Sequence, residues 1–107
     1  MTRAIIALAV LASPVLADTP RPAPGLYCPV GGEAAMPISV QPGGGMGIDG
    51  LDCSTVDLAG GRARSGACYA NGGSIVDLDV DLVVRPDGDL VHNGIRFRRH
   101  PGRPPCP

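Results

Sequence analysis

The clearest chemistry in this chain belongs to four cysteines: Cys28, Cys53, Cys68 and Cys106. An even number of cysteines in a short exported chain predicts two disulfides, and four cysteines allow three pairings. Cys106 lies in a proline-rich tail that needs an anchor, and Cys28 lies in the first predicted strand. Their positions favour a Cys28–Cys106 bond, which leaves Cys53 to pair with Cys68. A structural zinc site would normally show close C-x₂-C pairs, which are absent, so we expect no metal and no cofactor.

Three alternating aspartates, Asp77, Asp79 and Asp81, are the second group with a possible chemistry, because carboxylates bind calcium. Alternation places them on one face of a strand, about 7 Å apart, which is too wide for all three to close on one ion. We therefore expect a solvated face that discourages edge-to-edge pairing of sheets. Arg96 and Arg98 are expected to pair with these carboxylates across the sheet.

Residues suited to catalysis are few. The two histidines, His92 and His100, have no partner at a metal-ligand spacing, so we expect them on the surface and the methionines Met36 and Met46 in the core. Ser74 lacks the second glycine of a G-x-S-x-G nucleophile turn. Two disulfides would leave no cysteine as a nucleophile. The sequence therefore predicts no catalytic residue and no enzyme activity.

β-Strands are the elements that must position these side chains. The clearest is 75–85, where apolar residues alternate with aspartates at the period of two that is typical of a strand. Turn residues separate the further strands that we predict at 25–30, 37–41, 46–48, 51–53, 56–58, 62–69, 90–92 and 95–99. Short strands with closely spaced turns predict an all-β fold, a small antiparallel barrel or sandwich with two disulfides.

The N-terminus predicts a cleaved export signal. Arg3 precedes the apolar run 4–12, and small residues follow up to Ala17, which is the layout of a secretory signal peptide at 1–17. The run is far shorter than the roughly 20 residues of a membrane span, and cleavage would leave Asp18 first rather than a lipid-carrying cysteine. We therefore expect a periplasmic or secreted protein that is not a lipoprotein and has no transmembrane segment in its mature chain.

The predicted mature chain is one small domain. A proline-rich lead-in at 18–24 precedes a single disulfide-stapled β domain at 25–107. With no tryptophan and only three other aromatic residues, its core is expected to consist of valine, leucine, isoleucine and alanine, and the disulfides would offset a thin core. Eight arginines face ten acidic residues, a net charge of −2 that gives no electrostatic case for nucleic acid.

One segment resembles a known family. Ser65-Gly66-Ala67-Cys68-Tyr69 is similar to the S-G-x-x-Y segment of the periplasmic inhibitors of c-type lysozyme, the membrane-bound lysozyme inhibitor family. Tyr27-Cys28 near the start and Cys106 at the end fall in a similar order. The resemblance implies a small antiparallel barrel whose serine enters the lysozyme cleft. Ser65, Gly66 and Tyr69 are then the predicted partner contacts, although Cys68 stands where the family has lysine or arginine.

These observations predict a small, secreted or periplasmic, non-enzymatic β domain that binds an unidentified protein or small ligand. The alternative is a proteinaceous inhibitor of c-type lysozyme, with a lysozyme-type enzyme as its partner. A second alternative is a calcium-binding module that uses the three aspartates.

Overall fold

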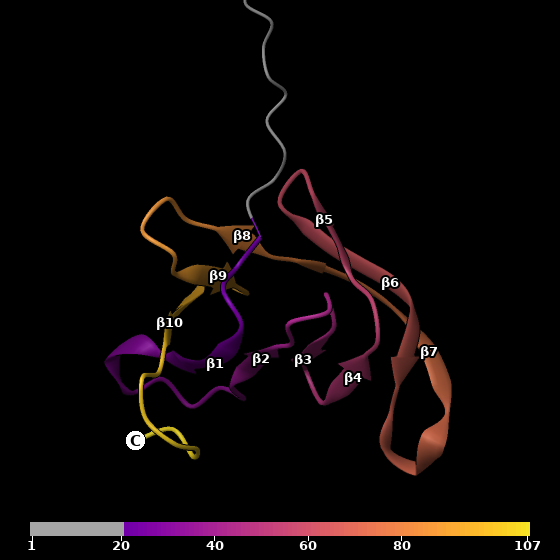
Figure 1. Ribbon diagram of the computed structural model, residues 1–107, viewed down its shortest axis with the longest axis horizontal. Helices are drawn as coiled ribbons and strands as arrows, with labels where there is room; N and C mark the ends of the chain where they lie inside the picture. The colour runs from indigo at the N-terminus through magenta and orange to yellow at the C-terminus, as the bar shows by residue number, and fades with distance from the viewer. Residues whose placement is uncertain (1–20) are drawn as a thin grey trace, which may run out of the picture.

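The structure is a computed structural model that describes residues 21–107, so the predicted signal peptide lies outside the described residues. Residues 21–107 form ten strands in one curled antiparallel sheet, a half-barrel (Figure 1). The helical residues of this part of the chain lie in two short 3₁₀ turns, η1 (Val30–Gly32) and η2 (Asn71–Gly73). The predicted all-β fold is confirmed. Over the same residues, no helix is long and apolar enough to cross a membrane.

The strands lie close to their predicted positions. They are β1 (Gly25–Pro29), β2 (Ile38–Val40), β3 (Met46–Ile48), β4 (Leu51–Cys53), β5 (Asp57–Ala59), β6 (Arg62–Tyr69), β7 (Ile75–Asp81), β8 (Val83–Val84), β9 (Leu90–His92) and β10 (Ile95–Arg99). Two predicted turns, Asp49-Gly50 and Asn93-Gly94, have positive φ at both residues. Such turns match the twist of a hairpin and favour an Asx-Gly pair, which is why the sequence located them correctly.

Within the curled sheet, the segment that contains β7 and β8 changes its partner strand. The strand order is β5-β6-β4-β3-β2-β1-β10-β9-β8, and β7 pairs with β6. The sequence predicted one strand over 75–85, and this is wrong in one respect: the strand is interrupted at Leu82, so β7 pairs with β6 whereas β8 pairs with β9. The Leu82 amide donates instead to the Gly61 carbonyl, at 2.9 Å, and its side chain is buried. This bend lets one segment join the two ends of the curl.

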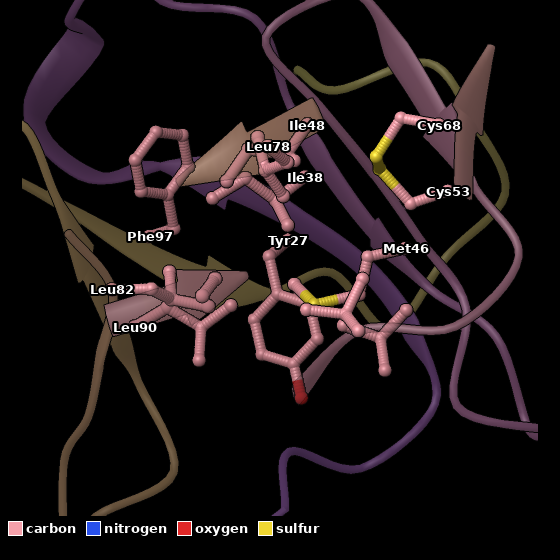
Figure 2. Close-up of a cluster of buried hydrophobic side chains, with 13 residues drawn as sticks. Tyr27, Ile38, Met46, Ile48, Cys53, Cys68, Leu78, Leu82, Leu90 and Phe97 are labelled. Carbon is pink, nitrogen blue, oxygen red and sulfur yellow. A yellow bond between two sulfur atoms is a disulfide. The ribbon is translucent and has the colours of Figure 1, made fainter. Parts of the chain in front are cut away.

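The core fills the inside of the curl (Figure 2). Its buried members within 21–107 are Tyr27, Ile38, Val40, Met46, Ile48, Cys53, Val56, Ala63, Cys68, Leu78, Leu82, Leu90 and Phe97. The expectation of a purely aliphatic core is wrong, because Tyr27 and Phe97 are its two largest fully buried side chains. They lie on the paired central strands β1 and β10, where the sheet surrounds them most completely.

Both predicted disulfides are present. Cys28 of β1 is bonded to Cys106 of the C-terminal tail, and Cys53 of β4 is bonded to its cross-strand neighbour Cys68 of β6. The tail is also fixed where it leaves β10, since the His100 amide donates to the Leu26 carbonyl at 2.7 Å. The first disulfide therefore holds the tail to a central strand, and the second is part of the core.

Candidate functional site

The residues predicted from the inhibitor motif lie on a strand rather than on an exposed loop. Ser65 is half-buried in β6 beside a bulge, and its Oγ accepts a hydrogen bond from the Ala67 amide at 3.0 Å. Ser65 and Gly66 border a shallow hollow of about 330 Å³ with Asp77 and Asp79. Tyr69 does not line this hollow, although it is exposed further along the same strand. The structure thus brings two of the three predicted contacts together.

The aspartates of β7 are engaged differently from our expectation. The Asp79 carboxylate forms ion pairs with Arg62 at 3.0 Å and with Arg64 at 3.3 Å. The hydrogen bond from Arg62 is the main reason why the pKa of Asp79 lies below its usual range. The predicted pairing of Arg96 and Arg98 with this face is wrong, because both arginines bind Asp89 instead. Over residues 21–107, no group of three or more histidine, cysteine, aspartate or glutamate side chains is arranged to hold a metal ion.

His92 is buried, with 4% of its surface exposed, which corrects the expectation of a surface histidine. Its Nδ1 lies 2.7 Å from the Asp81 carbonyl oxygen, and its Nε2 lies 2.9 Å from the Asp49 carboxylate. Both partners are acceptors, so a doubly protonated ring can donate to both, and this arrangement favours the imidazolium form. The methionine expectation also holds only in part, since Met46 is in the core whereas Met36 is 60% exposed.

The surroundings of His92 make stability depend on pH. Burial disfavours the charged ring and is the largest single influence, but hydrogen bonds to Asp49 and Asp81 and their charges together outweigh it and raise the pKa of His92. A raised folded-state pKa stabilises the fold fully below the unfolded value of about 6.5, and this contribution is lost as the pH rises through the folded-state pKa. Urea unfolding from pH 5 to pH 8.5 should therefore show stability falling toward the alkaline end.

Two variants isolate this effect. Asp49→Asn removes the carboxylate that faces Nε2, and we expect it to lower the pKa of His92 and to flatten the pH dependence. His100→Gln removes the other histidine, whose ring contacts only the Arg103 carbonyl among residues 21–107, and it should leave the dependence intact. A dependence that disappears in the His100 variant and persists in the Asp49 variant would contradict this account of His92.

A larger concave feature lies between the N-terminal lead-in, the 84–89 segment and the end of β10. It is a cleft of about 510 Å³ lined by 21–23, Tyr27, 84–89 and 98–99. Its volume falls in the range of ordinary ligand pockets. Tyr27 contributes to its floor, with a hydroxyl that donates to the Ala23 carbonyl at 2.6 Å. We refer to this feature as the arginine cleft.

A network of charges forms one wall of the arginine cleft. The Asp89 carboxylate is 7% exposed and binds Arg96 Nε at 2.7 Å and Arg98 at 3.1 Å, while Arg96 also binds Asp87 at 2.6 Å. The hydrogen bond from Arg98, assisted by Arg96, keeps the pKa of Asp89 below its usual range despite burial. Asp89 therefore stays ionised and fixes two guanidinium groups in place.

Two more arginines of the cleft are held loosely. Arg99 donates through Nε to the Pro24 carbonyl at 2.8 Å, and Arg85 has only a long contact of 3.5 Å from Nε to Asp87. The terminal nitrogens of both guanidinium groups have no hydrogen-bond partner among residues 21–107. Gly25, with a φ of 145°, has a backbone conformation that favours glycine, and a Cβ at this position would lie 2.7 Å from Arg99 Nε. The cleft thus presents guanidinium N–H donors that have no partner among residues 21–107.

Sequence reasoning missed the arginine cleft. The signals were the R-P-D-G-D turn at 85–89 and the R-F-R-R run at 96–99, but nothing in the sequence places these two segments beside the lead-in. That juxtaposition depends on the pairing of β1 with β10, which brings the start of the domain against its last strand.

No protein-family model matches this chain, and no curated protein or solved structure matches it either.

Proposed function

We propose that this protein is a secreted or periplasmic, non-enzymatic binding domain, and that the arginine cleft is its ligand site. The single observation that carries the proposal is a concave site of about 510 Å³ in a cross-linked half-barrel, where unused arginine N–H groups and apolar side chains line the same cleft. Ligand pockets commonly combine an apolar lining with a few fixed polar groups. The two disulfides support the secreted or periplasmic location, because disulfides persist in oxidising surroundings.

The chemistry of the cleft supports binding rather than catalysis. Its charged side chains are arginines, which remain protonated at any physiological pH, and two aspartates whose pKa values are lowered, Asp87 chiefly by a hydrogen bond from the Asp89 amide and Asp89 chiefly by one from Arg98. None of these groups is suited to accept and return a proton near neutral pH. Arginine and carboxylate groups held in this way can orient a ligand.

The lysozyme-inhibitor hypothesis has weaker support. A small curled antiparallel sheet agrees with the barrel that the resemblance implies, and Ser65 with Gly66 borders a hollow. An inhibitor that inserts into an enzyme cleft needs a projecting segment, whereas Ser65 is half-buried within a paired strand. The calcium hypothesis gains nothing from the structure, since two guanidinium groups already occupy the Asp79 carboxylate.

We predict that at least one class of small ligand, whether anionic, neutral or cationic, shifts the amide NMR signals of the arginine cleft and no others. The oxidised protein, labelled with ¹⁵N, would be screened by amide NMR against a panel with equal numbers of anionic, neutral and cationic fragments. The expected result is a set of shifts confined to 21–28, 84–91 and 97–100. The Arg85→Gln/Arg99→Gln variant should lose these shifts, and Arg64→Gln, on β6 outside the cleft, should keep them. Shifts spread over the surface, or none from any fragment, would refute the proposed site.

A further inference from the structure

We propose that the ligand of the arginine cleft is a small organic anion, a carboxylate attached to an apolar body. This inference rests on the proposed function and specifies its ligand class. It combines two observations. Arginines are concentrated at the cleft, and both arginines and apolar side chains line it.

Charge is strongly concentrated at the cleft. Five of the eight arginines of residues 21–107 belong to its wall and to the Asp89 network, together with two aspartates, which gives a local net charge of +3. The remaining three arginines and seven acidic residues give a net charge of −4. A chain that is slightly acidic overall thus has one cationic concavity. The cleft is lined by more arginines than aspartates, and an excess of one sign of charge in a concave site attracts ions of the opposite sign.

The cationic wall has the geometry for a carboxylate. Asp89 neutralises part of the charge of Arg98. The terminal nitrogens of Arg85 and Arg99, in contrast, donate no hydrogen bond to any of residues 21–107. A guanidinium presents parallel N–H donors that match the two oxygens of a carboxylate. The Asp87 and Asp89 carboxylates line the same cleft but are already paired with Arg96, so the terminal nitrogens of Arg85 and Arg99 are the donors left for an anion.

The rest of the wall is apolar. Pro22, Ala23, Tyr27, Val84 and Pro86 line the same cleft as the free guanidinium groups. A bare inorganic anion would leave this surface in contact with water, whereas a hydrocarbon or aromatic body would cover it and gain roughly 25 cal/mol for each Å² removed from water. The combination therefore favours an amphiphilic carboxylate over phosphate, although arginine binds both head groups.

The test uses phenylacetate, its uncharged analogue phenylacetamide, and inorganic phosphate as probes of the oxidised protein. We expect phenylacetate to shift the cleft amides with an affinity at least tenfold higher than that of either other probe. Hydrogen bonds to a charged group contribute about 1.5–3 kcal/mol, which corresponds to a factor of ten or more. Arg85→Gln and Arg99→Gln should each weaken phenylacetate binding about tenfold, while Arg64→Gln leaves it unchanged. Raising the salt concentration should also weaken it.

The other outcomes separate this inference from the proposed function. Equal binding of phenylacetamide and phenylacetate would refute the anion and leave the cleft as a ligand site. Phosphate binding as tight as phenylacetate would refute the apolar body. Binding of a cationic fragment at the cleft, with no shift from phenylacetate, would overturn only the inference about an anionic ligand. No shift from any probe would overturn both this inference and the proposed ligand site. Unchanged amide spectra of the free variants would exclude misfolding as the cause of any loss.

Discussion

Removing the Cys28–Cys106 disulfide by the double substitution Cys28→Ala/Cys106→Ala should lower the free energy of unfolding by about 4 kcal/mol. The bond joins residues 78 positions apart, so it closes nearly the whole domain into one loop. Without it, the unfolded chain gains the conformational freedom of that loop, and the expected stabilisation grows with the logarithm of loop length. Urea unfolding of the oxidised wild type and the variant, both at pH 6, would measure the difference.

The native state should change little in this variant, which distinguishes an effect on the unfolded chain from loss of packing. The His100 amide would still donate to the Leu26 carbonyl, and we expect amide shifts to change only near 28 and in the tail 100–107. A matched substitution in the same tail, Arg103→Ala, leaves the bond in place and should cost less than about 0.5 kcal/mol. A loss below about 1 kcal/mol in the cysteine variant would contradict the loop-closure argument.

The features that the sequence predicted well are those encoded locally. Strict alternation over 75–81 located β7, and the Asp49-Gly50 and Asn93-Gly94 pairs located two hairpin turns, because each signal lies within a few adjacent residues. The cysteine pairing could be inferred because the tail needed an anchor. The interruption at Leu82 could not, since alternation continues through it and only the partner strands on either side differ.

The candidate site depended on tertiary contacts that have no local signal. A lone histidine at the end of β9, next to a turn, is expected on the surface, yet His92 is enclosed by Asp49 and Asp81 from distant parts of the chain. Likewise, Arg96 and Arg98 could pair with any aspartate row that the topology placed beside them. The structure places the 87–89 turn there, because β9 rather than β7 is the neighbour of β10.

The second large effect is expected at Phe97. Phe97→Ala should destabilise the fold by about 3–5 kcal/mol, because it removes a fully buried aromatic ring and leaves a cavity that a disulfide-bonded sheet can only partly close. A domain of this size has only about 5–15 kcal/mol of stability, so the variant would lie near the limit of folding. Phe97→Leu fills most of the space and should cost clearly less.

Phe97 also connects the core to the arginine cleft, which gives the experiment a second measurement. Arg96 and Arg98 flank Phe97 on β10, so their alignment with Asp89 depends on how firmly the ring holds this strand against the core. We therefore expect Phe97→Leu, which stays folded, to weaken phenylacetate binding as well as stability. Tyr69→Ala removes an aromatic ring that is 46% exposed on β6, and it should change unfolding by less than about 1 kcal/mol and leave binding intact. Equal losses in the Tyr69 and Phe97→Ala variants would show that the core does not centre on β10.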